Sequence, residues 1–249
     1  MNRVESLILG AGYTGSRLEM ALESSKATRR QARPQCLEFD YDRKESWKNL
    51  PPSETCFWTF PAQTQNLKDF SELIFSRAKT IVIVSSTGFF LTTEKDEVVN
   101  EESKLDTSQD RVQAEEFLRE RGAIVVHAAG IYGPNRSPLD WLVTGRVGWS
   151  ENFLNLIHVD DLVSVLIQAS RLSGKSERWI ASDGQPKRWS ELILEWQKKY
   201  GIGEIKEKTG RRPSKRVDPS RTLSTLQIKL KYPSVYEGVD AMRGSSLSN

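Results

Sequence analysis

The chain has 249 residues, of which 37% are hydrophobic and 28% are charged. These proportions exclude collagen, coiled-coil arrays and disulfide miniproteins, and they are typical of a globular protein with one large domain and at most a small extra lobe. The formal net charge of +3 is too small to indicate a nucleic-acid partner.

The cysteine, histidine and hydropathy patterns further limit the class of protein. The two cysteines, Cys36 and Cys56, lack CxxC spacing, and the chain has only two histidines. This usage is typical of a reducing compartment and argues against a metal site, so we expect a cytoplasmic protein without a metal. The N-terminal apolar run over 7–9 is too short for a signal-peptide core, and no run approaches the roughly 18 residues of a membrane span. We therefore expect a soluble protein without membrane contact.

The first half of the chain alternates between two kinds of pattern. Short apolar runs rich in β-branched or aromatic residues predict strands over 4–9, 55–60, 80–84 and 123–128, with two weaker strands near 27–29 and 36–39. Helical spacing of apolar residues predicts helices over 14–24, 67–77 and 110–120. Such alternation favours a doubly wound α/β protein with a parallel sheet covered on both faces.

The second half is less regular. Gly133-Pro134 and Ser137-Pro138 predict loops, Asp160 is a candidate N-cap for a helix over 160–171, and a second helix is predicted over 189–196. We expect a first domain over 1–172 and a small lobe over 173–249 that packs on it. The basic stretch over 206–221 has no aromatic residues for base stacking, which favours a solvated loop over the alternative of RNA contact.

A glycine-rich motif follows the first predicted strand and precedes the first predicted helix. The sequence GAGYTG at 10–15 fits GxGxxG, in which the first glycine permits a tight turn, the second admits a pyrophosphate and the third allows close helix packing. The helix N-terminus offers amide donors and a positive dipole end to the phosphates. We therefore predict dinucleotide binding, with a glycine-rich turn without ligand as the alternative, at Gly10, Gly12, Tyr13, Thr14 and Gly15.

The identity of the dinucleotide depends on the residues about twenty positions further on. NAD-binding proteins place there an acid that contacts the ribose 2′-hydroxyl. This chain has Thr28-Arg29-Arg30 instead. Two guanidinium groups suit a 2′-phosphate, so Arg29 and Arg30 favour NADP over NAD, the alternative being two surface arginines.

Together these segments resemble the extended and atypical branches of the short-chain dehydrogenase/reductase superfamily, and most of all its small NAD(P)-binding members named as nucleoside-diphosphate-sugar epimerases. The resemblance covers nearly the whole chain. It implies a Rossmann fold with a small C-terminal substrate lobe, and it rests on GAGYTGSRL at 10–18, Phe39-Asp40, VIVSSTGFF at 82–90, AAGIYGPNR at 128–136 and IHVDDL at 157–162.

The resemblance also assigns roles to single residues. It implies that Ser86, next to Ser85, orients a substrate hydroxyl or carbonyl at a strand end, and that Asp40 lies near the adenine. The alternatives are a pair of serines that end a strand and an acid that caps a turn.

The chain departs from the superfamily at its catalytic Tyr-x-x-x-Lys motif. Counting back from Ala114-Glu115 places Thr107 at the tyrosine and Arg111 at the lysine. An aliphatic hydroxyl does not ionise usefully near neutral pH, whereas Arg111 can still hold a ribose or phosphate.

Two other residues are candidates for the missing acid. Tyr132 lies in the GIYGP turn, and His158 has the pKa class suited to proton transfer. The alternative for His158 is a hydrogen-bonded residue ahead of the following helix, and we expect His127 to pack within its strand.

Two functions remain open at this point. The first is an NADP-dependent epimerase or reductase, acting on a nucleotide-sugar-like or carbonyl substrate with Ser86 and Tyr132 at its catalytic site. The second is a dinucleotide-binding protein without hydride chemistry that serves as a redox sensor or assembly factor. The sequence predicts neither the substrate nor the oligomeric state.

Overall fold

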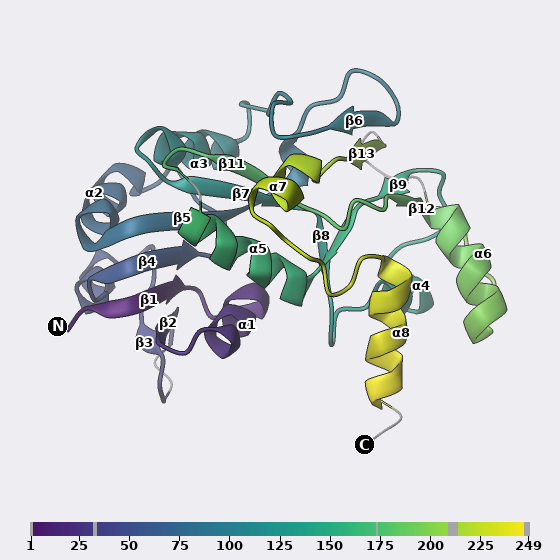
Figure 1. Ribbon diagram of the computed structural model, residues 1–249, viewed down its shortest axis with the longest axis horizontal. Helices are drawn as coiled ribbons and strands as arrows, with labels where there is room; N and C mark the ends of the chain where they lie inside the picture. The colour runs from purple at the N-terminus through teal and green to yellow at the C-terminus, as the bar shows by residue number, and fades with distance from the viewer. Residues whose placement is uncertain (1, 32–33, 173, 209–213, 247–249) are drawn as a thin grey trace.

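The computed structural model in Figure 1 describes residues 2–31, 34–172, 174–208 and 214–246. Its central feature is a sheet of seven strands in the order β3-β2-β1-β4-β5-β7-β11. Every neighbouring pair in this sheet is parallel. The strands are β1 (Val4–Leu9), β2 (Ser25–Arg29), β3 (Leu37–Glu38), β4 (Ser53–Trp58), β5 (Ala78–Ser86), β7 (Ile124–Ala128) and β11 (Arg178–Ala181).

Helices cover both faces of the sheet because its strands are apolar on both faces. In β1, Ile8 packs on the side of α1 (Tyr13–Ala21) and α5 (Val159–Leu172), whereas Leu7 and Leu9 pack on the side of α2 (Leu67–Arg77) and α3 (Asp110–Glu120). All three side chains are fully buried. Two apolar layers therefore hold the sheet between the helix pairs, which is the doubly wound Rossmann arrangement that the sequence predicts.

A lobe of smaller elements lies at the edge of the sheet toward which its strands point (Figure 1). Its apolar core includes Tyr132, Leu142 and Trp196. The remaining elements of the chain are η1 (Lys44–Asn49), η2 (Thr87–Phe89), β6 (Glu97–Val99), β8 (Gly130–Tyr132), α4 (Pro138–Val143), β9 (Phe153–Leu154), β10 (Leu156–His158), β12 (Lys187–Arg188), α6 (Trp189–Tyr200), β13 (Lys215–Val217), α7 (Ser220–Thr225) and α8 (Val235–Ser246).

The two predicted parts of the chain, 1–172 and 173–249, each contribute elements to both the sheet and the lobe. Strand β11, from beyond residue 172, pairs with β7 in the main sheet, and β8, from before residue 172, belongs to the lobe. The division at residues 172 and 173 stays a prediction. Of the basic stretch over 206–221, residues 209–213 lie outside the described part of the chain.

The start of α5 differs from the sequence prediction. The helix begins at Val159, so Asp160 lies in its first turn rather than at the N-cap. The Nδ1 atom of His158 accepts a hydrogen bond from the Asp160 amide at 3.2 Å. An imidazole therefore caps this helix where a carboxylate was expected.

Across the described ranges, the structure contains no helix with the length and apolar character needed to cross a membrane.

Candidate functional site

A cleft of about 810 Å³ opens where the parallel strands end. The order of the sheet reverses between β1 and β4, and in open α/β sheets the carboxyl ends at such a point form the ligand crevice. Residues from both the sheet and the lobe line the cleft. They include Gly10, Gly12, Tyr13, Thr14, Arg29, Arg30, Tyr41, Asp42, Phe60, Ser85, Ser86, Arg111, Arg136, Phe153 and Asn155.

The glycine loop is shaped by close contacts at its two ends. Gly10 has a φ of +93°, and its amide donates to Thr28 Oγ1 at 2.9 Å. A Cβ on Gly15 would lie 2.0 Å from the Gly10 carbonyl oxygen, whereas a Cβ on Gly12 would meet nothing within 4 Å. Gly15 thus lets α1 pack against the loop from behind, and Gly12 leaves open space on the cleft side.

The N-terminus of α1 presents unused donors next to that space. The backbone amides of Tyr13, Thr14 and Gly15 donate no hydrogen bond to any described residue, while Ser16 N already donates to the Gly12 carbonyl. The first turn of α1 has no acidic residue. Free amides and the positive end of the helix dipole therefore form a site for an anion.

The predicted 2′-phosphate site lies beside this helix end. Arg29 and Arg30 line the cleft and also a shallow depression of about 430 Å³ that shares Gly10, Gly12 and Thr28 with it. The Arg29 guanidinium reaches Ser16 Oγ at 3.4 Å. No carboxylate occurs between Thr28 and Gln31, so the end of β2 is cationic.

The far wall of this end is formed by residues that the sequence analysis missed. Asp40 does not line the cleft, because its carboxylate turns back to accept the Asp42 amide at 3.1 Å, as the turn-capping alternative predicts. Tyr41 and Asp42 line the cleft instead, together with Phe60. The sequence signal that could have found these residues is their position after strands: Tyr41-Asp42 follows β3 after two residues, and TFPAQ directly follows β4.

A buried ionic network sits at the end of β5. Ser86 lines the cleft, and its Oγ accepts the Gly88 amide at 3.1 Å. Glu115 accepts from Ser85 Oγ at 2.5 Å and from Arg111 Nε at 2.7 Å, and Arg111 Nη2 donates to the Val84 carbonyl at 2.8 Å. Burial raises the pKa of Glu115 while the Arg111 charge opposes that rise. The network fixes the Arg111 cation at the cleft wall.

The position that the resemblance assigns to the catalytic tyrosine has no phenol. Thr107 is exposed, precedes α3 and does not line the cleft. Tyr132 is fully buried in the lobe core, where its hydroxyl donates to the Ser234 carbonyl at 3.3 Å, so the structure does not bring it to Ser86. The buried position of Tyr132 therefore argues against a role as the catalytic acid.

Both histidines also lie outside the cleft. Burial lowers the pKa of His127 to about 3 and that of His158 to about 4, so both are neutral near pH 7. His127 is enclosed within β7, and His158 caps α5. Their arrangement accords with packing and capping rather than proton transfer.

The charge of the cleft is strongly one-sided. Among its described lining residues, Arg29, Arg30, Arg111 and Arg136 face a single carboxylate, Asp42. The Nε atom of Arg136 is buried without a hydrogen-bond partner in the described structure, and its guanidinium lies 5.5 Å from the Tyr13 ring centre. Among the described residues, no group of three His, Cys, Asp or Glu side chains could hold a metal ion. The cleft is suited to a ligand with several phosphates.

No protein-family model matches the chain, and no curated protein matches it. Solved structures match over nearly its full length. A Methylobacillus flagellatus protein described as an NAD-dependent epimerase/dehydratase is 21% identical, with a TM-score of 0.76 over 98% of this chain and 99% of that one.

Two further structures contain bound cofactors. The UDP-glucuronic acid 4-epimerase of Bacillus cereus, with NAD and UDP-4-deoxy-4-fluoro-glucuronic acid, is 14% identical, with a TM-score of 0.78 over 98% of this chain and 99% of that one. The RMD protein of Pseudomonas aeruginosa, with NADPH, is 13% identical, with a TM-score of 0.75 over 98% and 100%. The chain thus has the fold of epimerase and dehydratase structures, in agreement with the resemblance of its motifs.

The two glycines of the loop give a first prediction. Gly12→Val should abolish dinucleotide binding and leave the protein folded, because the added side chain enters open space on the ligand side. Gly15→Ala should instead destabilise the protein by about 1 to 3 kcal/mol, because its Cβ collides with backbone. Calorimetric titration with NADPH and thermal melts measure both effects. Undiminished NADPH affinity in a folded Gly12→Val variant would show that the dinucleotide does not bind at the glycine loop.

A buried carboxylate between the sheet and the lobe gives a second prediction. Asp183 is 5% exposed, its Oδ1 accepts the Gln185 amide at 2.9 Å, and its Oδ2 has no partner in the described structure. Burial raises the pKa of Asp183 to about 7. The folded state therefore binds the carboxyl proton of Asp183 more tightly than the unfolded state does. As a result, the free energy of unfolding falls as the pH rises from about 4 to about 7.

Replacing the carboxylate with an amide should remove that loss. Asp183→Asn keeps an oxygen for the Gln185 amide and should stabilise the protein by on the order of a few kcal/mol at pH 8, and by less at pH 5. Urea unfolding at the two pH values measures the difference, with the exposed Glu23→Gln as control. A gain that is equal at both pH values would contradict the assigned ionisation.

Proposed function

We propose that this protein binds NADP(H) in the cleft, with the 2′-phosphate at Arg29 and Arg30, the pyrophosphate at the start of α1 and the nicotinamide near the end of β5. The observation that carries the proposal is the row of unused amides at α1 directly beside two arginines. An anion can be held there by hydrogen bonds and by charge, without any rearrangement of the described backbone.

The choice of NADP over NAD follows from the end of β2. An adenosine ribose with two free hydroxyls would find no carboxylate between Thr28 and Gln31 to accept its hydrogen bonds. A 2′-phosphate would find two guanidinium groups, of which Arg29 is already oriented by Ser16.

We further propose that the lobe end of the cleft takes a phosphate-bearing ligand of the nucleotide-sugar class. In the described structure the buried Nε of Arg136 has no hydrogen-bond partner, and Phe153 offers a ring to the same cleft. Asn155 also lines the cleft, but its side-chain amide is already bonded to the Lys215 carbonyl and the Val217 amide. The Phe153 ring is held in place by the guanidinium of Arg188, 4.2 Å from its centre. The Bacillus cereus structure, which contains a UDP-sugar derivative, supports this class.

The chemistry available to the chain is limited by its proton donors. A bound nicotinamide would supply hydride transfer, and the chain would then have to supply or remove a proton at the substrate oxygen. The titratable groups lining the described cleft, apart from arginines, are Tyr13, Tyr41 and Asp42. Both phenols donate to backbone carbonyls, and burial raises the pKa of each. We propose that dinucleotide binding, rather than rapid turnover, is the main function.

A second candidate function is a slow epimerase or reductase. The specific observation in its favour is that Ser86 and Arg111 both line the cleft at the end of β5. In that case Ser86 would orient the substrate oxygen, and Arg111 would hold a ribose or phosphate. Turnover measurements separate the two candidates.

The cofactor assignment gives a third prediction. The parent protein should bind NADPH more tightly than NADH, because each arginine adds a charge-assisted hydrogen bond worth about 1.5 to 3 kcal/mol. The double variant Arg29→Ala and Arg30→Ala should lose the preference and retain NADH binding. Fluorescence titration measures both affinities, and equal affinities in the parent would refute the assignment.

The missing phenol gives a fourth prediction. The parent should show little hydride transfer with the superfamily's ordinary carbonyl and alcohol substrates, since the loss of general acid–base catalysis costs about 10² to 10⁴ in rate. Thr107→Tyr combined with Arg111→Lys should not raise the rate of NADPH oxidation, because Thr107 is exposed and lies outside the cleft. Tyr132→Phe serves as control and should have no effect. Robust parental turnover that Tyr132→Phe abolishes would show that Tyr132 supplies the proton.

A further inference from the structure

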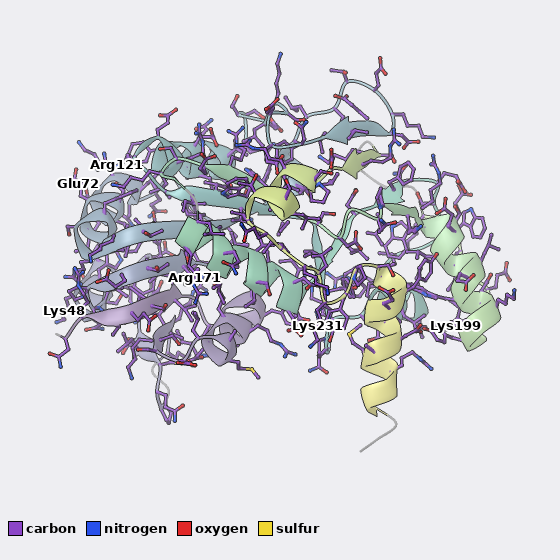
Figure 2. The ribbon with its side chains drawn as sticks, viewed as in Figure 1. Lys48, Glu72, Arg121, Arg171, Lys199 and Lys231 are labelled. Carbon is purple, nitrogen blue, oxygen red and sulfur yellow. The ribbon has the colours of Figure 1, made fainter. Side chains whose placement is uncertain are left out.

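Another cavity, of about 330 Å³, lies at the opposite edge of the sheet, where the parallel strands begin. It is bounded by the end of α2, the start of β5, the turn after α3 and the loop before β11. Figure 2 shows Arg121 at this side of the molecule, far from the lobe helices. Among the described residues, the cavity is lined by no carboxylate and by five cationic side chains, Arg3, Arg77, Lys79, Arg121 and Lys175.

Three of these cations are already engaged. Arg77 Nη1 donates to the carbonyls of Trp47 and Leu50. Arg3 and Lys79 share one carboxylate, Glu54, at 2.7 Å and 2.6 Å. The strand-edge cations are therefore only partly neutralised by the one acid that contacts them.

The other two cations have no polar partner in the described structure. Arg121 and Lys175 are exposed and form no hydrogen bond or ion pair with a described residue. The Arg121 guanidinium lies 5.6 Å from the ring centre of Phe75 and 5.4 Å from that of Phe117. The two rings hold the planar group in place while its N–H donors remain available.

Helix dipoles explain only part of this arrangement. Both α2 and α3 end at this edge, and cations there compensate the partial negative charge of the last carbonyls. That account fits Arg77, in the last turn of α2, and Arg121, directly after α3. It does not fit Arg3, Lys79 or Lys175, which lie outside helices, and it does not require a cavity.

We propose that this cavity binds a small ligand that carries two or more phosphate groups. Its volume falls at the lower end of the range of small-molecule sites, about 300 to 1,000 Å³. Guanidinium forks and ammonium groups that converge from several chain segments can each take a different phosphate oxygen. The cations surround a cavity rather than forming a long stripe, which favours a compact polyanion over a nucleic-acid backbone.

The cavity is separate from the dinucleotide cleft, yet one strand connects them. Ala78, at the start of β5, lines the cavity, and Ser86, at its end, lines the cleft. Because the two sites have no lining residue in common, both ligands can be bound at the same time.

Titration with inorganic tripolyphosphate tests the proposal. The titration is designed for the Gly12→Val background, in which the proposed phosphate site at α1 should be blocked. Binding is measured by calorimetry at low salt. Arg121→Glu and Lys175→Glu should each weaken binding by about tenfold or more, the effect of losing one charge-assisted contact and adding a repulsive charge. Lys229→Glu is the matched control, because it makes the same charge change at an exposed site outside this cavity and should leave the affinity unchanged.

Three results would overturn the proposal. The first is an absence of tripolyphosphate binding in the Gly12→Val background, since any binding to the parent would then belong to the α1 site. The second is equal weakening by all three charge reversals, which would indicate a general effect of net charge. The third is a single-stranded oligonucleotide that binds through Arg121 and Lys175 while tripolyphosphate fails to displace it. Arg121→Glu and Lys175→Glu made in the parent protein, without Gly12→Val, should leave NADPH binding unchanged, so the test is independent of the proposed cofactor.

Discussion

The close packing of α1 against the Gly10 carbonyl is the contact on which the rest of the site depends. It exists because Gly15 has no side chain, since a Cβ there would lie 2.0 Å from that oxygen. The contact sets the direction of α1 relative to β1, and this direction determines where the first amides of the helix point. Thr28 then connects the same loop to β2, which places Arg29 and Arg30 beside those amides.

The replacement of the catalytic pair has unequal consequences for binding and for chemistry. Arg111 keeps a cation at the cleft wall, and Glu115 together with the Val84 carbonyl holds it in a defined position. Thr107 lies outside the cleft and supplies no ionisable group. A chain with this pattern keeps a cation in the cleft and has no phenol at Thr107, and this combination supports the proposed binding function over a fast enzyme.

Much of the fold could be predicted from the sequence, because the relevant signals are local. Apolar runs gave the positions of β1, β4, β5 and β7, helical spacing gave α2 and α3, and one glycine motif placed the loop between β1 and α1. Structural similarity to epimerase and dehydratase folds confirms the doubly wound class. The pairing of β11 with β7 was not predictable in this way, because sheet order is decided by contacts between distant segments.

Side-chain directions at the site were harder to predict. The GIYGP turn approaches the cleft, but the Tyr132 ring points into the lobe, where Gly238 leaves room for its hydroxyl. Asp40 and Tyr41 are neighbours in sequence, and only the second faces the cleft. The five cations at the opposite edge of the sheet come from four separate segments of the chain, so no linear motif could have revealed that they converge.

The exchange of strands between the sheet and the lobe limits how the protein can move. The backbone passes from β7 in the sheet to β8 in the lobe, from β10 in the lobe to α5 on the sheet, and from β11 in the sheet to α6 in the lobe. A hinge between two bodies needs few connecting segments, and here several would have to bend together. Ligand entry therefore depends on local loop and side-chain adjustments, and the overall dimensions of the protein in solution should stay nearly constant when its cleft is filled.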